Sequence, residues 1–163
     1  MNDGPQLRLR LASNPLYLSG VRELLSAVCR RLGFAEDVCG QIALAVDEAL
    51  CNVIRHGYDR AADRPIWLNL WTIGAGDESV DPAAAEGIRL VIEDEARQVE
   101  PGKIKGRNLE EIKPGGLGVH IIHEVMDTVQ YEKREQNGMR LTMVKRRPGA
   151  RAAVPAKLEA SHG

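Results

Sequence analysis

The sequence has no long apolar run and no excess of charge of either sign. No stretch approaches the roughly 18 apolar residues that a membrane-spanning helix needs, and the first residues, MNDGPQ, lack the charged-then-apolar pattern of a secretion signal. Twenty-two basic residues against 23 acidic ones give a formal charge of -1, which provides no global attraction to nucleic acid or to an anionic membrane. We therefore expect a cytoplasmic protein with no direct nucleic-acid or membrane partner, whose charged function is local.

Cysteine is scarce, and its spacing matches no zinc module. Cys29, Cys39 and Cys51 fall in helical contexts, and an odd count suits a reducing compartment. We expect them to be thiols of the core rather than metal ligands.

No internal repeat and no second core interrupt the chain. Its 163 residues, 44% hydrophobic and 28% charged, suit one soluble domain. We expect this domain to cover residues 8–147, after an N-terminal tail of residues 1–7. From Pro148 the chain is Ala-rich and net basic, so residues 148–163 are expected to be a disordered tail.

Hydrophobic periodicity divides the domain into strands and helices. In PIWLNLWTI, Ile66, Leu68 and Leu70 occupy every second position, as in a strand with one buried face. Apolar residues spaced by three and four predict two helices instead, which end near Gly33 and Gly57. The predicted elements are strand 8–13, helix 16–34, helix 35–57, strand 65–73, strand 87–95, helix 117–127, strand 128–134 and strand 138–147. This order predicts an α+β fold, a two-layer α/β sandwich with a mainly antiparallel sheet covered on one face by helices.

Two polar residues stand beside the apolar stripe of the second predicted helix. Glu48 and Asn52, in DEALCNVIRHGY, are four residues apart and so neighbour each other on the helix surface. If this edge borders a cleft, the amide oxygen of Asn52 is a hard ligand suited to magnesium, and the carboxylate of Glu48 can act as a general base. The same spacing fits the solvated margin of a buried helix, so the pair alone does not decide between the two.

A glycine-rich turn opens the third predicted helix. In PGGLG, residues 114–118, the glycines let the backbone approach a ligand, and the free N–H groups of the first helical turn can hold a phosphate. Neither GxGxxG nor a P-loop pattern is present, so neither of those phosphate sites is supported. A long polar segment before the turn carries cations that could close over a polyphosphate as a lid: Lys103, Lys105, Arg107 and Lys113. An ordinary turn with a solvated loop remains the alternative.

Two further positions complete the list of candidates. Asp94 ends a predicted strand, where its carboxylate can accept a hydrogen bond from an exocyclic amine such as adenine N6; an exposed edge charge is the alternative. His120 and His123 are three apart on a helix and share a face, which would suit a metal, but the sequence provides no evident third ligand.

These motifs together resemble a known family. EALCNVIRHGY is similar to the N-box of the GHKL ATPases, VIEDEARQVEP stands where their DxGxG box belongs, and PGGLGVHIIHEVMD is similar to their second glycine box. Within that superfamily the chain most resembles the anti-sigma regulatory factors. These are small kinases that sequester a sigma factor and phosphorylate a serine or threonine of an anti-anti-sigma partner of the STAS type.

The resemblance implies a Bergerat-type site for ATP and Mg2+. In such a site Glu48 would be the catalytic base, Asn52 would coordinate magnesium, and Asp94 would bind adenine. The full set of cofactor-binding positions that it implies is Asn52, Asp94, Ala96, Lys113, Gly115, Gly116, Leu117 and Gly118. It also makes a homodimer plausible.

One box departs from the family pattern. Where the family has two glycines after its aspartate, this chain has Ala96 and Gln98. A methyl group at 96 and a longer side chain at 98 would crowd the adenine pocket or alter the motion of the lid. The alternative function is therefore a non-catalytic regulatory binding module of the same fold, with weakened or absent ATP turnover.

Overall fold

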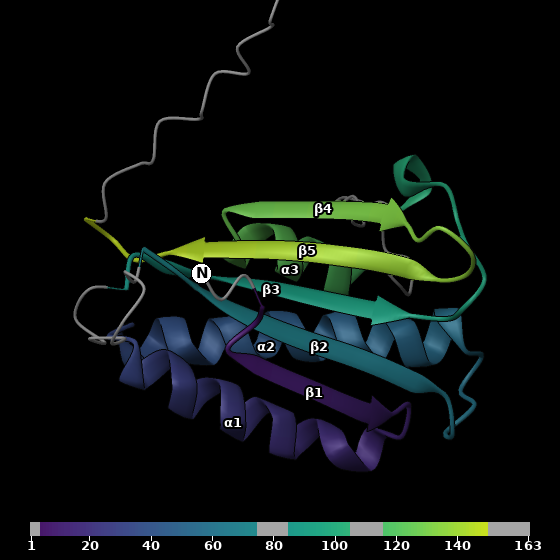
Figure 1. Cartoon of the computed structure of the whole chain (residues 1–163), viewed down its shortest axis with the longest axis horizontal. Helices are drawn as coiled ribbons and strands as arrows, with labels where there is room; N and C mark the ends of the chain where they lie inside the picture. The colour runs from purple at the N-terminus through teal and green to yellow at the C-terminus, as the bar shows by residue number, and fades with distance from the viewer. Residues whose placement is uncertain (1–3, 75–84, 105–115, 150–163) are drawn as a thin grey trace, which may run out of the picture.

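The computed structural model describes residues 4–74, 85–104 and 116–149. Within them, one sheet lies against a layer of helices (Figure 1). The strands are β1 (Leu7–Ala12), β2 (Pro65–Ile73), β3 (Gly87–Asp94), β4 (Thr128–Lys133) and β5 (Met139–Arg146). The helices are α1 (Leu18–Arg31), α2 (Glu36–Asn52) and α3 (Leu117–Val125), with the short turns η1 (Pro15–Tyr17), η2 (Val53–Gly57) and η4 (Pro101–Lys103). The predicted α+β sandwich is confirmed.

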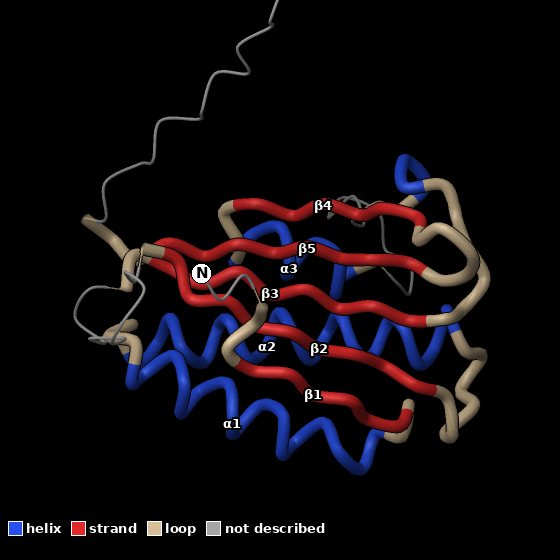
Figure 2. The backbone as a smooth tube through the Cα atoms, viewed as in Figure 1, coloured by secondary structure: helices blue, strands red, loops and turns tan. Residues whose placement is uncertain are grey.

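The strands follow the order β1-β2-β3-β5-β4, and every neighbouring pair is antiparallel. Figure 2 shows them side by side in this order, with the three α-helices on one face of the sheet. The register aligns Leu9, Leu68, Ile92 and Leu141 across four strands. Because residues in register point to the same face, this row forms part of the apolar face under the helices.

The core lies between that face and the helices. Ile66 and Leu68 are 0% exposed and Leu70 is 2% exposed, so the alternation read in PIWLNLWTI marks the buried face as predicted. Helix α2 packs against both α1 and α3, and Ile42 and Leu50 on its inner side are fully buried. Burying a side chain of this kind contributes about 1.5–3 kcal/mol. Helix α2 is therefore a fixed support for the polar residues along its edge.

The helix ends differ in detail from the predicted ones. Pro15 starts a 3-10 turn, in which the Leu16 N–H donates to Asn14 Oδ1 at 3.0 Å, and α1 begins only at Leu18. Gly33 follows α1 with φ 81°, which is the conformation expected of a glycine stop. The third helix ends at Val125 rather than at residue 127. The expected C-terminal tail falls largely outside the described residues.

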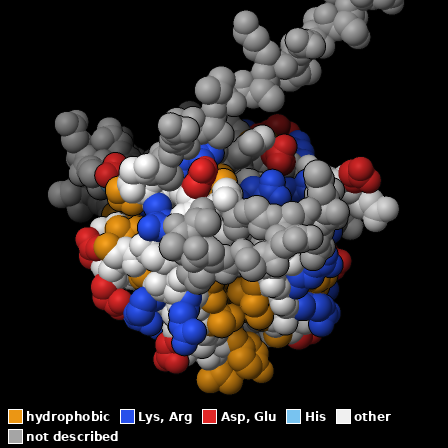
Figure 3. All heavy atoms as spheres, turned by 60° about the vertical axis from the view of Figure 1, so that its left-hand side comes forward, with side chains coloured by type: hydrophobic (Ala, Val, Ile, Leu, Met, Phe, Trp, Pro, Cys, Tyr) orange, Lys and Arg blue, Asp and Glu red, His pale blue; other side chains and the backbone are white. Residues whose placement is uncertain are grey.

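The surface carries charges of both signs. Figure 3 shows acidic and basic side chains mixed over one end of the molecule, with hydrophobic side chains gathered at its lower edge. None of the described helices is both long enough and apolar enough to cross a membrane. Because charges of both signs are mixed on this face, a strong local electrostatic potential requires a specific cluster of charged groups.

Candidate functional site

A cavity of about 330 Å³ lies between α2, the end of β3 and the start of α3. Four of the predicted cofactor-binding residues line it, although they are far apart in the sequence: Asn52, Asp94, Ala96 and Gly116. Most other lining side chains are apolar. A mainly apolar cavity of this size with a few convergent polar groups is typical of a small-molecule site.

Asp94 is the buried acid of this cavity. It is the last residue of β3 and is 5% exposed. Its Oδ1 accepts hydrogen bonds from the N–H groups of Ala96 at 2.8 Å and Met139 at 3.1 Å. Burial raises the pKa of Asp94, while these two hydrogen bonds and nearby Arg134 act in the opposite direction. Both of these bonds end on Oδ1, and Oδ2 takes part in neither of them.

Asn52 and Glu48 occupy different places at the edge of α2. Asn52 is the last residue of α2, is half-buried and lines the cavity. The chain continues from it as the π-helical turn η2, and such turns occur frequently at functional sites. Glu48 does not line the cavity. It lies instead beside α3, where a Cβ added to Gly118 would stand 2.5 Å from Glu48 Oε2.

The glycine turn before α3 reaches the same cavity. Gly116 precedes α3 with φ 79° and lines the cavity, so the backbone reaches the site without a side chain in the way. Gly118 leaves the space that the Glu48 carboxylate occupies. Leu117 is 49% exposed and is not a lining residue. Gly115 and Lys113 lie outside the described residues.

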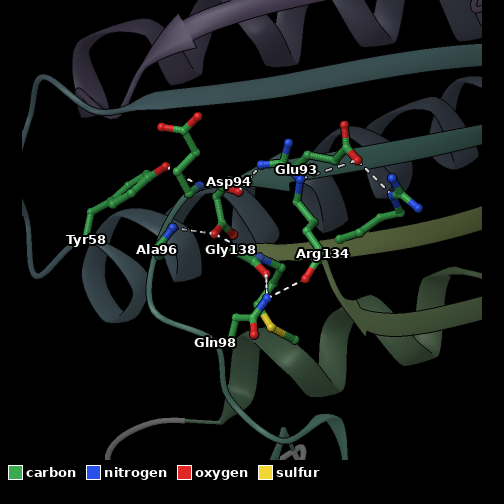
Figure 4. A network of polar contacts seen from close by, with 10 residues as sticks. Tyr58, Glu93, Asp94, Ala96, Gln98, Arg134 and Gly138 are labelled. Atoms are coloured by element: carbon green, nitrogen blue, oxygen red, sulfur yellow. Dashed lines mark hydrogen bonds and ion pairs between the residues drawn. The ribbon is translucent and has the colours of Figure 1, made fainter. Parts of the chain in front are cut away.

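Ala96 and Gln98 do not both crowd the cavity. Ala96 is buried and lines it, and its methyl group lies 3.0 Å from the position that a Cβ on Gly57 would occupy. The absence of a side chain at Gly57 therefore gives the methyl group its space. Gln98 is not a lining residue, and its side chain points to the turn between β4 and β5 (Figure 4). The expected crowding is thus limited to one methyl group.

Strands β4 and β5 contribute a wall that the sequence reasoning missed. Tyr131, Met139 and Leu141 line the cavity, and Tyr131 pairs with Leu141 across the two strands. Burial raises the pKa of Tyr131 to about 12. Alternation within TVQYEK is a signal for which side Tyr131 faces, but only the order of the strands brings it to the same cavity as Asp94. His56 also lines the cavity.

The structure describes the predicted lid only in part, and it describes both histidines of the pair in α3. Lys103 lines the cavity, whereas Lys105 and Arg107 lie outside the described residues. His120 lies 3.9 Å from Glu124 one turn further along α3. In the described part of the chain, no group of three or more His, Cys, Asp or Glu side chains could hold a metal ion.

The sequence is similar to two curated serine-protein kinases. The chain is 27% identical over 137 residues to the serine-protein kinase RsbW of Halalkalibacterium halodurans, covering 79% of this chain and 75% of the relative. It is 22% identical over 151 residues to the serine-protein kinase RsbW of Bacillus subtilis, covering 92% of this chain and 91% of the relative.

A solved structure shares the fold. The RsbU and RsbW domains of a Mycobacterium tuberculosis protein superpose with a TM-score of 0.54 at 15% identity, over 87% of this chain and 33% of that chain. The family described as histidine kinase-like ATPase domain matches residues 11–145, a span that includes α2, the end of β3 and the start of α3. The chain therefore belongs to the histidine kinase-like ATPase domain family.

Proposed function

We propose that the protein is an ATP-dependent serine/threonine kinase that also sequesters a sigma factor, and that its phosphate acceptor is an anti-anti-sigma protein. The observation that carries this proposal is the convergence of Asn52, Asp94 and Gly116 on one cavity, with Glu48 beside α3. The names of the relatives, serine-protein kinases RsbW, support the kinase activity. The compartment is the cytoplasm, and a homodimer is the proposed assembly.

The residues present fit an adenine nucleotide. The apolar part of the cavity suits a flat base, and Oδ2 of Asp94 can accept a hydrogen bond from the exocyclic amine of that base. Gly116 opens α3 with φ 79°, so the N–H groups of the first turn can approach the phosphates. Lys103 lies on the same cavity and can offset their negative charge.

Magnesium fits as an ion shared between the protein and the nucleotide. The described residues provide no cage of acidic or histidine ligands, but magnesium in nucleotide sites is commonly bound by few protein groups together with phosphates and water. The amide oxygen of Asn52, at the end of α2, is the protein ligand that we assign. When bound, the ion would offset charge on the phosphates.

Glu48 is the proposed base for the acceptor hydroxyl. Its carboxylate lies against Gly118, within the first turn of α3, and so it borders the end of the site that we assign to phosphate. A carboxylate there can orient the incoming serine or threonine hydroxyl and accept its proton. Phosphorylation adds about two negative charges to the partner, which would change its affinity for the kinase.

A non-catalytic regulatory module is the second candidate. Two observations favour it: Glu48 does not line the cavity, and Ala96 stands where the family has glycine. Such a module would bind its partner and occlude it without turnover. Calorimetry with ATP and magnesium separates the candidates, because no heat at millimolar nucleotide would favour occlusion.

The kinase proposal predicts a specific effect of Glu48→Gln. With a matched anti-anti-sigma protein and labelled ATP, we expect phosphate transfer to fall by about 10²–10⁴-fold, the usual contribution of a general base. ATP affinity should stay within about twofold, because the variant removes a group that acts on the acceptor. Glu132→Gln, an exposed residue of β4, is the control with the same change of charge. Transfer by Glu48→Gln at the rate of the control would refute the base assignment.

A further inference from the structure

We propose that Gln98 and Arg134 are positioning residues that hold the Asp94 carboxylate in the orientation needed to select a base with an exocyclic amine. We call this pair, with the β4–β5 turn that it binds, the Asp94 clamp. The inference rests on the proposed nucleotide function, and it assigns the source of base selectivity within that function. Figure 4 shows the clamp residues around the end of β3.

Gln98 ties the segment after β3 to the β4–β5 turn. Its Nε2 donates to the carbonyl oxygen of Arg134 at 2.5 Å and to that of Gly138 at 3.3 Å. The side chain is half-buried and does not line the cavity. A glutamine in this place uses both of its amide hydrogens on one turn, so it fixes the separation between that turn and residue 98.

Arg134 ties the same turn to the end of β3. Its Nη1 donates to the carbonyl oxygen of Asp94 at 2.5 Å, and its Nε lies 3.8 Å from Glu93 Oε1. The guanidinium also lies over the ring of Trp67, 5.4 Å from the ring centroid. Three contacts hold the side chain in one orientation, so the backbone of Asp94 cannot shift without breaking a charge-assisted hydrogen bond.

The turn also provides a donor to the Asp94 side chain. Gly138 has φ 85° and lies so close to β3 that a Cβ there would collide with the Asp94 carbonyl oxygen. The next residue, Met139, donates its N–H to Asp94 Oδ1. A displacement of the turn therefore moves one of the two donors that set the plane of the carboxylate, while Ala96 N–H provides the other.

This arrangement has a consequence for base recognition. With Oδ1 held by two N–H groups, Oδ2 faces a ligand only as an acceptor, because the carboxylate carries no proton when it is ionised. An exocyclic amine can donate a hydrogen bond to Oδ2. A ring carbonyl at the same place would put a second acceptor against Oδ2, with no hydrogen between the two oxygens. Sites built to bond an amine discriminate strongly against analogues that lack it. The clamp keeps Oδ2 in that position.

The test uses Gln98→Glu, which keeps the shape of the side chain and places an oxygen against two carbonyl oxygens. Gln136→Glu is the matched control, because Gln136 is an exposed residue of the same turn. Calorimetry with ATP and with inosine triphosphate, which has a carbonyl in place of the amine, measures the selectivity. Hydrogen exchange at the Ala96 and Met139 N–H groups measures the clamp without any nucleotide.

We expect Gln98→Glu to lower ATP affinity roughly tenfold, the effect of weakening one hydrogen bond to a charged group, and to leave inosine triphosphate affinity unchanged. We also expect faster exchange at both N–H groups than in the Gln136→Glu control. An unchanged ratio of the two affinities would overturn the selectivity role, and unchanged exchange would overturn the positioning role. If the unmodified protein binds neither nucleotide, the proposed function fails and the selectivity role fails with it, whereas faster exchange would still support the positioning role.

Arg134→Met is the second variant in case Gln98→Glu does not fold. Methionine keeps an apolar stem near Trp67 but cannot donate to the Asp94 carbonyl oxygen. The same loss of preference for ATP is expected. A loss of affinity that is equal for both nucleotides would mean that the variant damages the site as a whole, which would overturn the positioning role of Arg134.

Discussion

Replacing Asp94 by asparagine should separate binding from stability. Asparagine has the same shape, and its carbonyl oxygen can take the place of Oδ1 as acceptor for the N–H groups of Ala96 and Met139. Its amide nitrogen would take the place of Oδ2 and would present a donor to the exocyclic amine of a base. Losing a hydrogen bond to a charged group costs about 1.5–3 kcal/mol, so ATP affinity should fall by roughly 10- to 150-fold.

The stability of the same variant should move the other way. Burial raises the pKa of Asp94 above its ordinary value, so the carboxyl group favours the folded state when it is protonated. That contribution is complete below the pKa of the unfolded chain and is lost as the pH rises through the higher folded pKa. Asparagine does not titrate. Asp94→Asn should therefore gain stability relative to the unmodified protein as the pH rises through that window, and should be at least as stable at pH 7.

Thermal unfolding between pH 3 and pH 8, together with calorimetry of ATP, checks both parts. Glu95→Gln is the control, because Glu95 is an exposed acid next to Asp94. A variant that unfolds at a lower temperature than the unmodified protein at pH 7 would refute the reasoning. In that case the ionised carboxylate would be a structural group, and a loss of ATP binding would follow from damage to the fold.

Two further substitutions test the packing around the cavity. Gly118→Ala should fold, since alanine is favoured over glycine in a helix by about 0.5–1 kcal/mol. Its Cβ would stand 2.5 Å from Glu48 Oε2 and displace that carboxylate, so phosphate transfer should fall more than ATP affinity. Equal losses in single-turnover and binding assays would contradict this. Gly57→Ala should cost about 1–3 kcal/mol by overpacking against the Ala96 methyl group, and adding Ala96→Gly should recover most of it. Urea unfolding of the two single variants and the double variant measures this coupling, and strictly additive effects would show that the two residues do not share space.

The strands and the main helices were predictable because strands and helices each have a characteristic spacing of hydrophobic residues. Ile66, Leu68 and Leu70 alternate, and the structure buries all three. Gly33 adopts positive φ at the helix end that the sequence predicts. Such signals are local, so one sequence is enough to read them.

The contacts of the site were less predictable because they depend on pairing between distant segments. The spacing of Glu48 and Asn52 made them neighbours on α2, but it could not show that Asn52 lines the cavity while Glu48 lies beside Gly118. The polarity of Gln98 likewise does not indicate which residues its side chain contacts. Its side chain reaches the β4–β5 turn only because β3 pairs with β5. Such contacts require the strand order, which no local pattern of the sequence specifies.

The departure of Ala96 and Gln98 from the family pattern has a physical answer in two parts. The methyl group of Ala96 occupies space that Gly57 leaves open, and Gln98 bonds the neighbouring turn. Both residues therefore have contacts within the fold that do not require the cavity to be filled. Nucleotide binding in this chain thus depends on whether the base fits beside one extra methyl group.

A crystal structure with a non-hydrolysable ATP analogue and magnesium tests the central proposal most directly. The account predicts density for the base in the cavity, with its amine at about 3 Å from Asp94 Oδ2, phosphates at the Gly116 turn and magnesium at the amide oxygen of Asn52. Density for the nucleotide elsewhere on the protein, or an unchanged cavity at millimolar analogue, would contradict it.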